Sequence, residues 1–156
     1  MKADWTEEKE LKEEKEKILR EVEEIISKWG LKMPKEVCLV LDFGLGDFYN
    51  QGLVEFWVAN EEKEGYCGKF LFLFEKQTCP SHFHRFKHET FFVVKGKVKM
   101  KADGKEFIMA EGDVFPMKQG ALHSFQAVEG PALILEVSKP CVPKDSIFED
   151  ERIGEL

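Results

Sequence analysis

Residues 79–96 read Cys79-Pro-Ser-His-Phe-His-Arg-Phe-Lys-His-Glu-Thr-Phe-Phe-Val-Val-Lys-Gly96 and contain the pattern H-x-H-x4-E, formed by His82, His84 and Glu89. Side chains two residues apart in a strand project to the same face, so an extended chain presents both imidazoles together. Glu89 opens a run of strand-forming residues. A turn after His84 would bring its carboxylate back towards the imidazoles.

A second segment, Gly112-Asp-Val-Phe-Pro116 followed by Gly120-Ala-Leu-His123, supplies another histidine. Three imidazoles and one carboxylate are enough protein ligands for a divalent transition metal, with coordination positions left open. Surface and core histidines are common alternatives to ligands. Here, however, all three histidines fall in predicted strand segments punctuated by glycine and proline. His88 is interpreted as a loop residue without a role.

The sequence after Gly30 consists of short apolar runs separated by turn residues. The strands are expected at 37–41, 53–59, 68–74, 90–95, 97–102, 105–110, 113–116, 123–127 and 132–137. Asp103-Gly104 is typical of a two-residue hairpin, and Lys95-Gly96 and Glu129-Gly130-Pro131 are expected to separate strands. Many short strands with regular turns indicate an all-β sandwich or barrel.

Residues 4–29 are predicted to form one amphipathic helix. Its apolar positions recur at helical spacing only in the last turns, and Gly30 ends it. We therefore expect two parts: residues 1–34 as helix and connector, and residues 35–156 as a barrel with a C-terminal tail. The runs 70–74 and 91–94 are apolar on both strand faces, whereas a strand with one solvent-exposed face alternates between apolar and polar residues. A covering element is expected, and a homodimer is predicted.

Composition narrows the class of protein. The chain has 156 residues with 43% hydrophobic content, which suits one folded domain, and its net charge of −7 argues against a nucleic-acid partner. No apolar run is long enough to span a membrane, and the N-terminus has no apolar signal core, so a cytoplasmic protein is expected. Four scattered cysteines without a C-x-x-C pair argue against structural zinc and a disulfide framework.

Three further residues are candidates for chemistry. Glu136 lies in the otherwise apolar run 132–137; if its face lines the barrel, its pKa rises and it can act as a general base, whereas otherwise it faces solvent. Lys69 is either an electrophilic partner for a developing oxyanion or a surface lysine. Lys87, in the turn between the ligands, either reaches a substrate oxygen at the barrel mouth or is a solvated loop residue.

Both histidine segments resemble the two motifs of the cupin superfamily, which are jelly-roll barrels of the double-stranded β-helix type. The first motif, G-x5-H-x-H-x3/4-E-x6-G, is matched from His82 to Gly96, although Lys76 stands where its first glycine would be. The second is matched with altered spacing, and Gln126 and Ala127 stand near its usual asparagine. The resemblance covers roughly residues 54–137. It implies an all-β cupin barrel whose metal ligands are His82, His84, Glu89 and His123.

A narrower resemblance is to the D-lyxose isomerase branch of the cupins. It rests on five segments: Asp42-Phe-Gly-Leu-Gly-Asp47, Tyr66-Cys-Gly-Lys69-Phe, the H-x-H-x2-K-x-E core, Leu135-Glu136-Val137-Ser138, and the tail 145–153. It implies an aldose–ketose isomerase dependent on a divalent metal, with manganese expected first and iron, nickel, cobalt or zinc as alternatives. Glu136 and Lys69 would then act on the sugar.

The implied reaction interconverts a small free sugar such as D-lyxose or D-mannose with its ketose through an enediol. No cluster of arginines marks a phosphate pocket, which favours an unphosphorylated sugar. Two other functions stay open on the residues alone. A 3-His-1-Glu site can hold iron for an O2-dependent dioxygenase, and the domain can be a non-catalytic module that binds a sugar or another metabolite.

Overall fold

The computed structural model describes residues 5–156, with side chains from Lys9 onward, and divides into two compact units that meet between Met33 and Pro34. The first unit contains α1 (Trp5–Lys28), which confirms the predicted helix except at Asp4, a position outside the described residues. The helix ends as its sequence predicts. Gly30 has a φ of 73°, and the amides of Gly30 and Leu31 donate to the carbonyls of Ser27 and Ile26. This is a Schellman-type cap.

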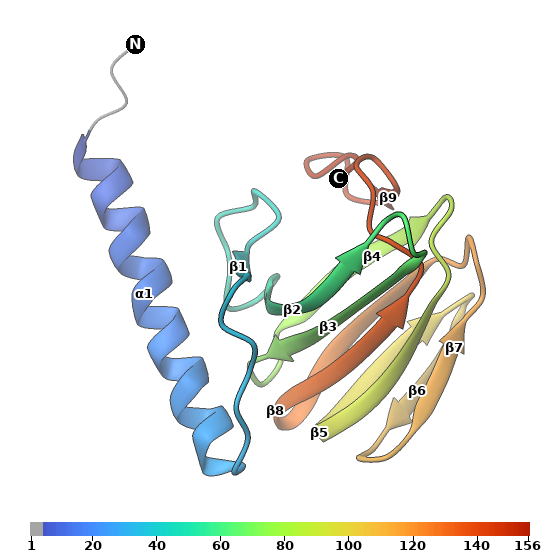
Figure 1. Cartoon of the computed structure of the whole chain (residues 1–156), viewed down its shortest axis with the longest axis horizontal. Coiled ribbons are helices and arrows are strands. Elements are labelled where there is room, and N and C mark those ends of the chain that lie inside the picture. Colours follow the sequence, from blue (N-terminus) through green and yellow to red (C-terminus); the bar gives the residue numbers. More distant parts are fainter. Residues whose placement is uncertain (1–4) are drawn as a thin grey trace. The chain divides into compact units, whose positions relative to one another are not determined.

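The second unit is a single curled sheet of antiparallel strands (Figure 1), so the predicted all-β class is confirmed. The strands are β1 (Cys38–Leu41), β2 (Leu53–Glu61), β3 (Tyr66–Leu73), β4 (Thr78–His84), β5 (Glu89–Ala102), β6 (Lys105–Met109), β7 (Val114–Met117), β8 (His123–Ser138) and β9 (Ser146–Phe148). The long strand β8 pairs with β3, β4 and β5 and therefore joins the sheet together.

The predicted strand breaks at 95–96 and 129–131 are wrong, because β5 and β8 each continue through them. The glycines there make irregularities within paired strands instead of turns: Gly96 has a φ of 82° and Gly130 a φ of 114°. The irregularity changes which face each strand buries. In β5, Glu89, Phe91 and Val93 are buried before it and Val98, Met100 and Ala102 after it, a shift from odd to even positions.

Two strands, β4 and β9, lie outside the expected ranges. β4 shows that the stretch around His82 and His84 is extended, as the convergence of their side chains requires, even though Pro80 lies within it. β9 was not predicted, because its three residues are too few to show an alternating pattern. It pairs with β4, where Phe148 lies opposite His82 and Ser146 opposite His84. The tail therefore lies against the strand that carries two candidate ligands.

The core lies inside the curled sheet. Its buried apolar side chains come mainly from β3, β5 and β8, and include Leu71, Leu73, Phe91, Val93, Met100, Phe125, Ala132 and Ile134. Phe92, on the opposite face of β5, is 36% exposed. The expected dimer stays a prediction. Within residues 5–156, no helix is both long enough and apolar enough to cross a membrane.

Candidate functional site

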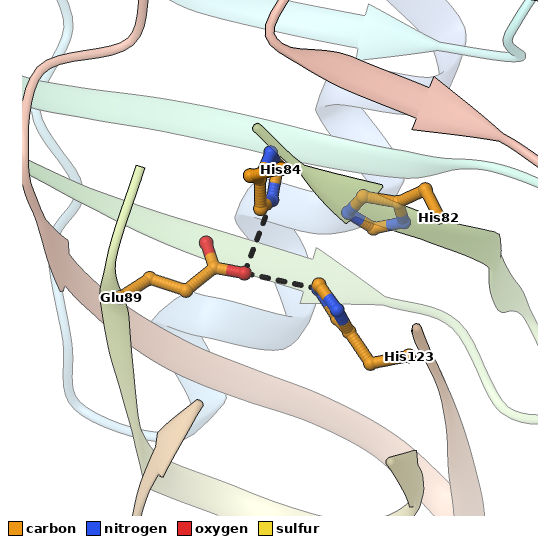
Figure 2. A group of neighbouring side chains, drawn as sticks. All are labelled: His82, His84, Glu89 and His123. Atoms are coloured by element: carbon orange, nitrogen blue, oxygen red, sulfur yellow. Dashed lines mark ion pairs between the residues drawn. The ribbon is translucent and has the colours of Figure 1, made fainter. Parts of the chain in front are cut away.

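The four predicted ligands come together on the inner face of the sheet. His82 and His84 come from β4, Glu89 from the start of β5, and His123 from the start of β8 (Figure 2). All four are buried, and one ligand atom from each lies within 4.8 Å of those from the others. The alternation of β4 places its two imidazoles on one side, as the sequence predicts. Pairing of β4 with β8 places His123 directly opposite His82.

The imidazoles are oriented by their outer nitrogens. Nδ1 of His82 lies 2.8 Å from the carbonyl of Pro80, and Nδ1 of His123 lies 2.9 Å from the carbonyl of Ala121. Since a carbonyl only accepts hydrogen bonds, both Nδ1 atoms carry the proton and donate it. Burial, followed by the neighbouring His123 and His84, holds the pKa of His82 well below its usual value, so this ring is neutral. Its Nε2 then offers a lone pair.

The inner atoms of the site have no hydrogen-bond partner among the described residues: Nε2 of His84, Nε2 of His123 and both carboxylate oxygens of Glu89 are buried and unsatisfied. The two nitrogens nevertheless lie 3.1 and 2.9 Å from Oε1 of Glu89 (Figure 2). These contacts are close but are not aligned as hydrogen bonds. In a neutral ring whose Nδ1 carries the proton, Nε2 is a hydrogen-bond acceptor. It would then face a carboxylate oxygen that is also an acceptor, and no hydrogen bond could form between them. A divalent cation satisfies these atoms together, so the residues fit a metal ion.

The C-terminal tail supports these ligands from outside. Oγ of Ser146 lies 3.1 Å from Nδ1 of His84, and the ring of Phe148 stacks on His82 with a centroid distance of 4.8 Å. Partners of this kind fix the rotamer of a metal-binding histidine. The tail resembles that of the isomerase branch in sequence, but neither Ser146 nor Phe148 was predicted to have a role at the site.

A cavity of about 290 Å³ opens beside the four ligands, and its lining includes Glu55, Lys69, Lys87 and Glu136. Glu136 is 3% exposed and shares a buried face with Ala132 and Ile134, so it does not face solvent. Lys87 is also buried, and its Nζ lies 3.1 Å from Oε2 of Glu136 and 3.2 Å from Oε2 of Glu89. A solvated loop position for Lys87 is therefore wrong.

Asp145 explains why Lys87 is directed inward. Its carboxylate accepts hydrogen bonds from the backbone amides of Phe86, at 2.7 Å, and Lys87, at 3.1 Å. The connection after β4 thereby folds back under the tail. This contact joins segments 58 positions apart in the sequence, so no local pattern could have indicated it.

Lys69 lies in the cavity wall and not on the surface. In the pairing of β3 with β8 it stands directly opposite Glu136. Its ammonium forms an ion pair with Glu55 and lies 4.7 Å from the ring centre of Trp57. Glu55 and Trp57 were not predicted from the sequence as residues of the site. The signal for Glu55 was available, because it is a single carboxylate in the apolar run Leu53-Val-Glu-Phe-Trp-Val58, as Glu136 is in its own strand.

Burial and ion pairing shift the pKa of each of these groups. Burial raises the pKa of Glu136, although the nearby Lys69 and Lys87 oppose the increase. Burial would lower the pKa of both lysines, but the surrounding carboxylates outweigh it and raise the pKa of Lys69 and of Lys87. Burial alone would raise the pKa of Glu89. The charge of Lys87 is the largest of the opposing effects, which together hold the pKa of Glu89 well below its usual range. Both lysines are therefore charged at neutral pH.

A curled antiparallel sheet with three inward histidines and one glutamate defines the class of protein, which is a cupin. The sequence profile of the cupin domain matches residues 70–138. That of the D-lyxose isomerase family matches residues 5–100, and the chain belongs to this family. The protein is accordingly a sugar isomerase.

Individual relatives agree with this assignment. The chain is 33% identical to the D-lyxose/D-mannose isomerase of Thermosediminibacter oceani, with 78% of this chain and 81% of the relative covered. It is 30% identical to the D-lyxose ketol-isomerase of Cohnella laeviribosi, with 86% and 90% covered. The solved structure of Cellulomonas parahominis L-ribose isomerase without ligand superposes with a TM-score of 0.71 at 17% identity, with 89% and 92% covered. This last similarity supports the fold.

Proposed function

We propose that the protein is a metal-dependent aldose–ketose isomerase that acts on a small free sugar such as D-lyxose or D-mannose through an enediol. The observation that carries the proposal is one cavity that joins two sets of groups. The first is a cluster of metal-ligand atoms on His82, His84, Glu89 and His123, of which those on His84, Glu89 and His123 are unsatisfied among the described residues. The second is a buried carboxylate, Glu136, which contacts the ammonium of Lys87 and stands opposite Lys69 across the strand pair.

The size and lining of the cavity suit a monosaccharide. A volume of about 290 Å³ is at the small end for ligand pockets. Buried Lys69 and Lys87 can donate to sugar hydroxyls. The indole nitrogen of Trp57 is a further donor, since it is buried and has no hydrogen-bond partner in the described part of the chain. Two of the relatives named above act, by their names, on D-lyxose, and this supports the same substrate class here.

His82, His84, Glu89 and His123 would hold the metal, with manganese proposed first. When bound, a divalent cation supplies Lewis-acid polarisation of neighbouring sugar oxygens. The chain itself fixes the ligands. Carbonyl oxygens of Pro80 and Ala121 hold two rings in the tautomer that directs Nε2 inward.

Glu136 is proposed as the general base. It would take the proton from the carbon next to the carbonyl and return it to the neighbouring carbon. Burial raises its pKa towards the working pH, and this favours proton transfer in both directions. Its carboxylate is held by Lys87 and by the hydroxyl of Ser138, which donates at 3.3 Å. These contacts fix the orientation of the base.

Lys69 and Lys87 are proposed to stabilise the negative charge that develops on the sugar. Both are charged and buried, so their fields are weakly screened by solvent. Lys69 is aligned with Glu136 across the strand pair, and Lys87 contacts it directly. The two ammonium groups therefore lie next to the group from which negative charge is transferred.

The decisive variant is Glu136→Gln. The amide keeps the shape of the side chain but cannot take a proton, so we expect turnover of D-lyxose to fall by about 10²–10⁴-fold while metal content stays unchanged. Glu129→Gln is the matched control, because Glu129 lies on the same strand but is exposed and pairs with Lys97. Unchanged turnover in Glu136→Gln would remove the proposed role of this residue.

Two further measurements separate the proposal from its alternatives. Isomerisation in D2O should place deuterium on the carbon next to the carbonyl, whereas full retention of hydrogen there would rule out a solvent-exchanging enediol. The same assay without oxygen should run at the same rate. Oxygen dependence would indicate a dioxygenase, and absence of turnover on pentoses and hexoses would indicate a binding module.

A further inference from the structure

Two cysteines meet beside the cavity without a role in the proposed reaction. Cys67 lies in β3, and Cys141 lies in the connection between β8 and β9. Their sulfur atoms are 3.7 Å apart, although 74 positions separate them in the sequence. A disulfide has a sulfur–sulfur distance of about 2.05 Å, so side-chain rotation has to close a gap of less than 2 Å.

Backbone contacts fix the positions of both residues. The side-chain amide of Asn60 donates to the carbonyl of Cys141 at 3.0 Å and accepts from its backbone amide at 2.9 Å. Cys67 is held in the sheet, where it pairs with Ser138. Asn60 belongs to β2 and stands opposite Cys67 where β2 pairs with β3. One asparagine therefore places Cys141 next to the strand that carries Cys67.

Within the pair, the environment favours a thiolate on Cys67, whereas the hydrogen bond with Cys67 and burial raise the pKa of Cys141. The hydrogen bond from Cys141 lowers the pKa of Cys67 to about 7, although burial acts in the opposite direction. The ammonium of Lys87 lies 3.7 Å from the sulfur of Cys141. A nearby cation is a common feature of reactive thiols. Cys141 also lines the cavity and is only partly buried, so a small molecule can reach it.

We propose that Cys67 and Cys141 form a reversible disulfide that fastens the C-terminal tail to β3. The oxidant is a small disulfide such as oxidised glutathione. After its proton passes to the thiolate of Cys67, the sulfur of Cys141 attacks this small disulfide and forms a mixed disulfide, and the displaced glutathione thiolate takes the proton from Cys67 and leaves as a thiol. The thiolate of Cys67 then attacks the sulfur of Cys141 and displaces the second glutathione as a thiolate. Two protein thiols are thus oxidised while one small disulfide is reduced.

The consequence is a more stable tail. Residues after Cys141 contribute Asp145, Ser146 and Phe148, which contact Lys87, His84 and His82 respectively. Closing a loop of this length restricts the unfolded chain, and for a chain of this size we expect the melting temperature to rise on the order of 10 °C. The proposal concerns stability and does not depend on the reaction catalysed.

The test compares the full chain before and after incubation with oxidised glutathione. The reduced protein has four cysteines. After oxidation we expect two titratable thiols, a mass loss of two hydrogen atoms, a peptide pair that links Cys67 to Cys141, and a higher melting temperature. Dithiothreitol should reverse all four changes.

Three variants make the test specific. Cys67→Ser and Cys141→Ser should each abolish the linked peptide and the rise in melting temperature. Cys38→Ser, which changes a cysteine in β1, should retain both. The proposal is overturned if oxidation links different cysteines, joins two chains, stops at a glutathione adduct, or leaves the melting temperature of the unmodified sequence unchanged.

Discussion

Gly96 offers a sharp test of how the sheet positions the site. It lies in the irregularity of β5 with a φ of 82°, where side chains are strained. A Cβ atom at this position would lie 2.4 Å from the carbonyl oxygen of Pro131 and 3.0 Å from Cα of Ala132. Both neighbours belong to β8, upstream of Glu136. The substitution Gly96→Ala therefore has to displace backbone in the strand that carries the proposed base.

Gly104 is a matched control for the size of this effect. It has a φ of 75°, so alanine there carries the same backbone strain, but nothing lies within 4 Å of the added Cβ. Left-handed backbone costs an alanine about 1 kcal/mol at either position. Overpacking against backbone adds about 1–3 kcal/mol at Gly96 alone. We expect Gly104→Ala to lose about 1 kcal/mol of unfolding free energy and Gly96→Ala about 2–4 kcal/mol.

Urea unfolding of the two variants and of the unmodified sequence measures this difference directly, provided that the m-values agree. Gly96→Ala should also lower isomerase turnover at a temperature where it is still folded, whereas Gly104→Ala should not. Equal loss of stability in both variants, within about 0.5 kcal/mol, would refute the steric argument. It would mean that the backbone around Gly96 shifts freely to accommodate the methyl group, and that the irregularity does not determine which side chains of β8 face inward.

Three further outcomes are expected. His84→Ala should lose most of the bound metal that the unmodified protein carries, as measured by elemental analysis, because it removes one of four ligands; full retention would show that the ligand set is wrong. Ser146→Ala should weaken metal affinity about 10-fold in a chelator competition, because His84 loses the partner of its Nδ1, while Ser124→Ala should leave affinity unchanged. Lys69→Met should cost about 3–5 kcal/mol at pH 7 by leaving Glu55 buried without its ammonium. Because the pKa of Lys69 is raised in the fold, its contribution to the free energy of unfolding is full below the unfolded pKa of 10.5 and should fade only as the pH rises above that value. A stability difference between Lys69→Met and the unmodified protein that is already lost at pH 9 would contradict the pairing.

The sequence predicted the strands well wherever a turn or an alternating pattern marked their limits. β1, β2, β3, β6 and β7 begin and end within two residues of the expected positions. Apart from β4 and β9, which lie outside the expected ranges, the errors lie at Gly96 and Gly130, where a glycine indicates either a turn or an irregularity within a strand. Only pairing with another strand decides between the two. That pairing joins residues more than 30 positions apart, as between Val93 and Ile134, and no local pattern contains it.

The same limit separates the residues that the sequence identified from those that it missed. The proposed metal ligands stand in short, regular motifs, and the resemblance of these motifs to those of the cupins was enough to predict them. Glu136 was visible as a lone charge in an apolar strand. The residues that support the site, Asp145, Ser146 and Phe148, come from a polar tail whose composition resembles any solvated loop. They act only because β9 pairs with β4, and a three-residue strand is too short to predict.

The buried charges around the cavity suit proton transfer within a bound sugar. The buried carboxylates that line the cavity, on Glu55, Glu89, Glu136 and Asp145, outnumber its two buried ammonium groups, on Lys69 and Lys87. Excess negative charge at a buried site is costly, and a divalent cation at the four proposed ligands would offset it. In the proposed reaction, Glu136 would take a proton from the sugar, and negative charge would move from the carboxylate to a sugar oxygen without a change in the total. Because charged groups are already in place on both sides of this transfer, little reorganisation is needed at the moment of reaction. A module that only binds a neutral sugar would gain nothing from burying six charged side chains, and this favours catalysis as the reason for their arrangement.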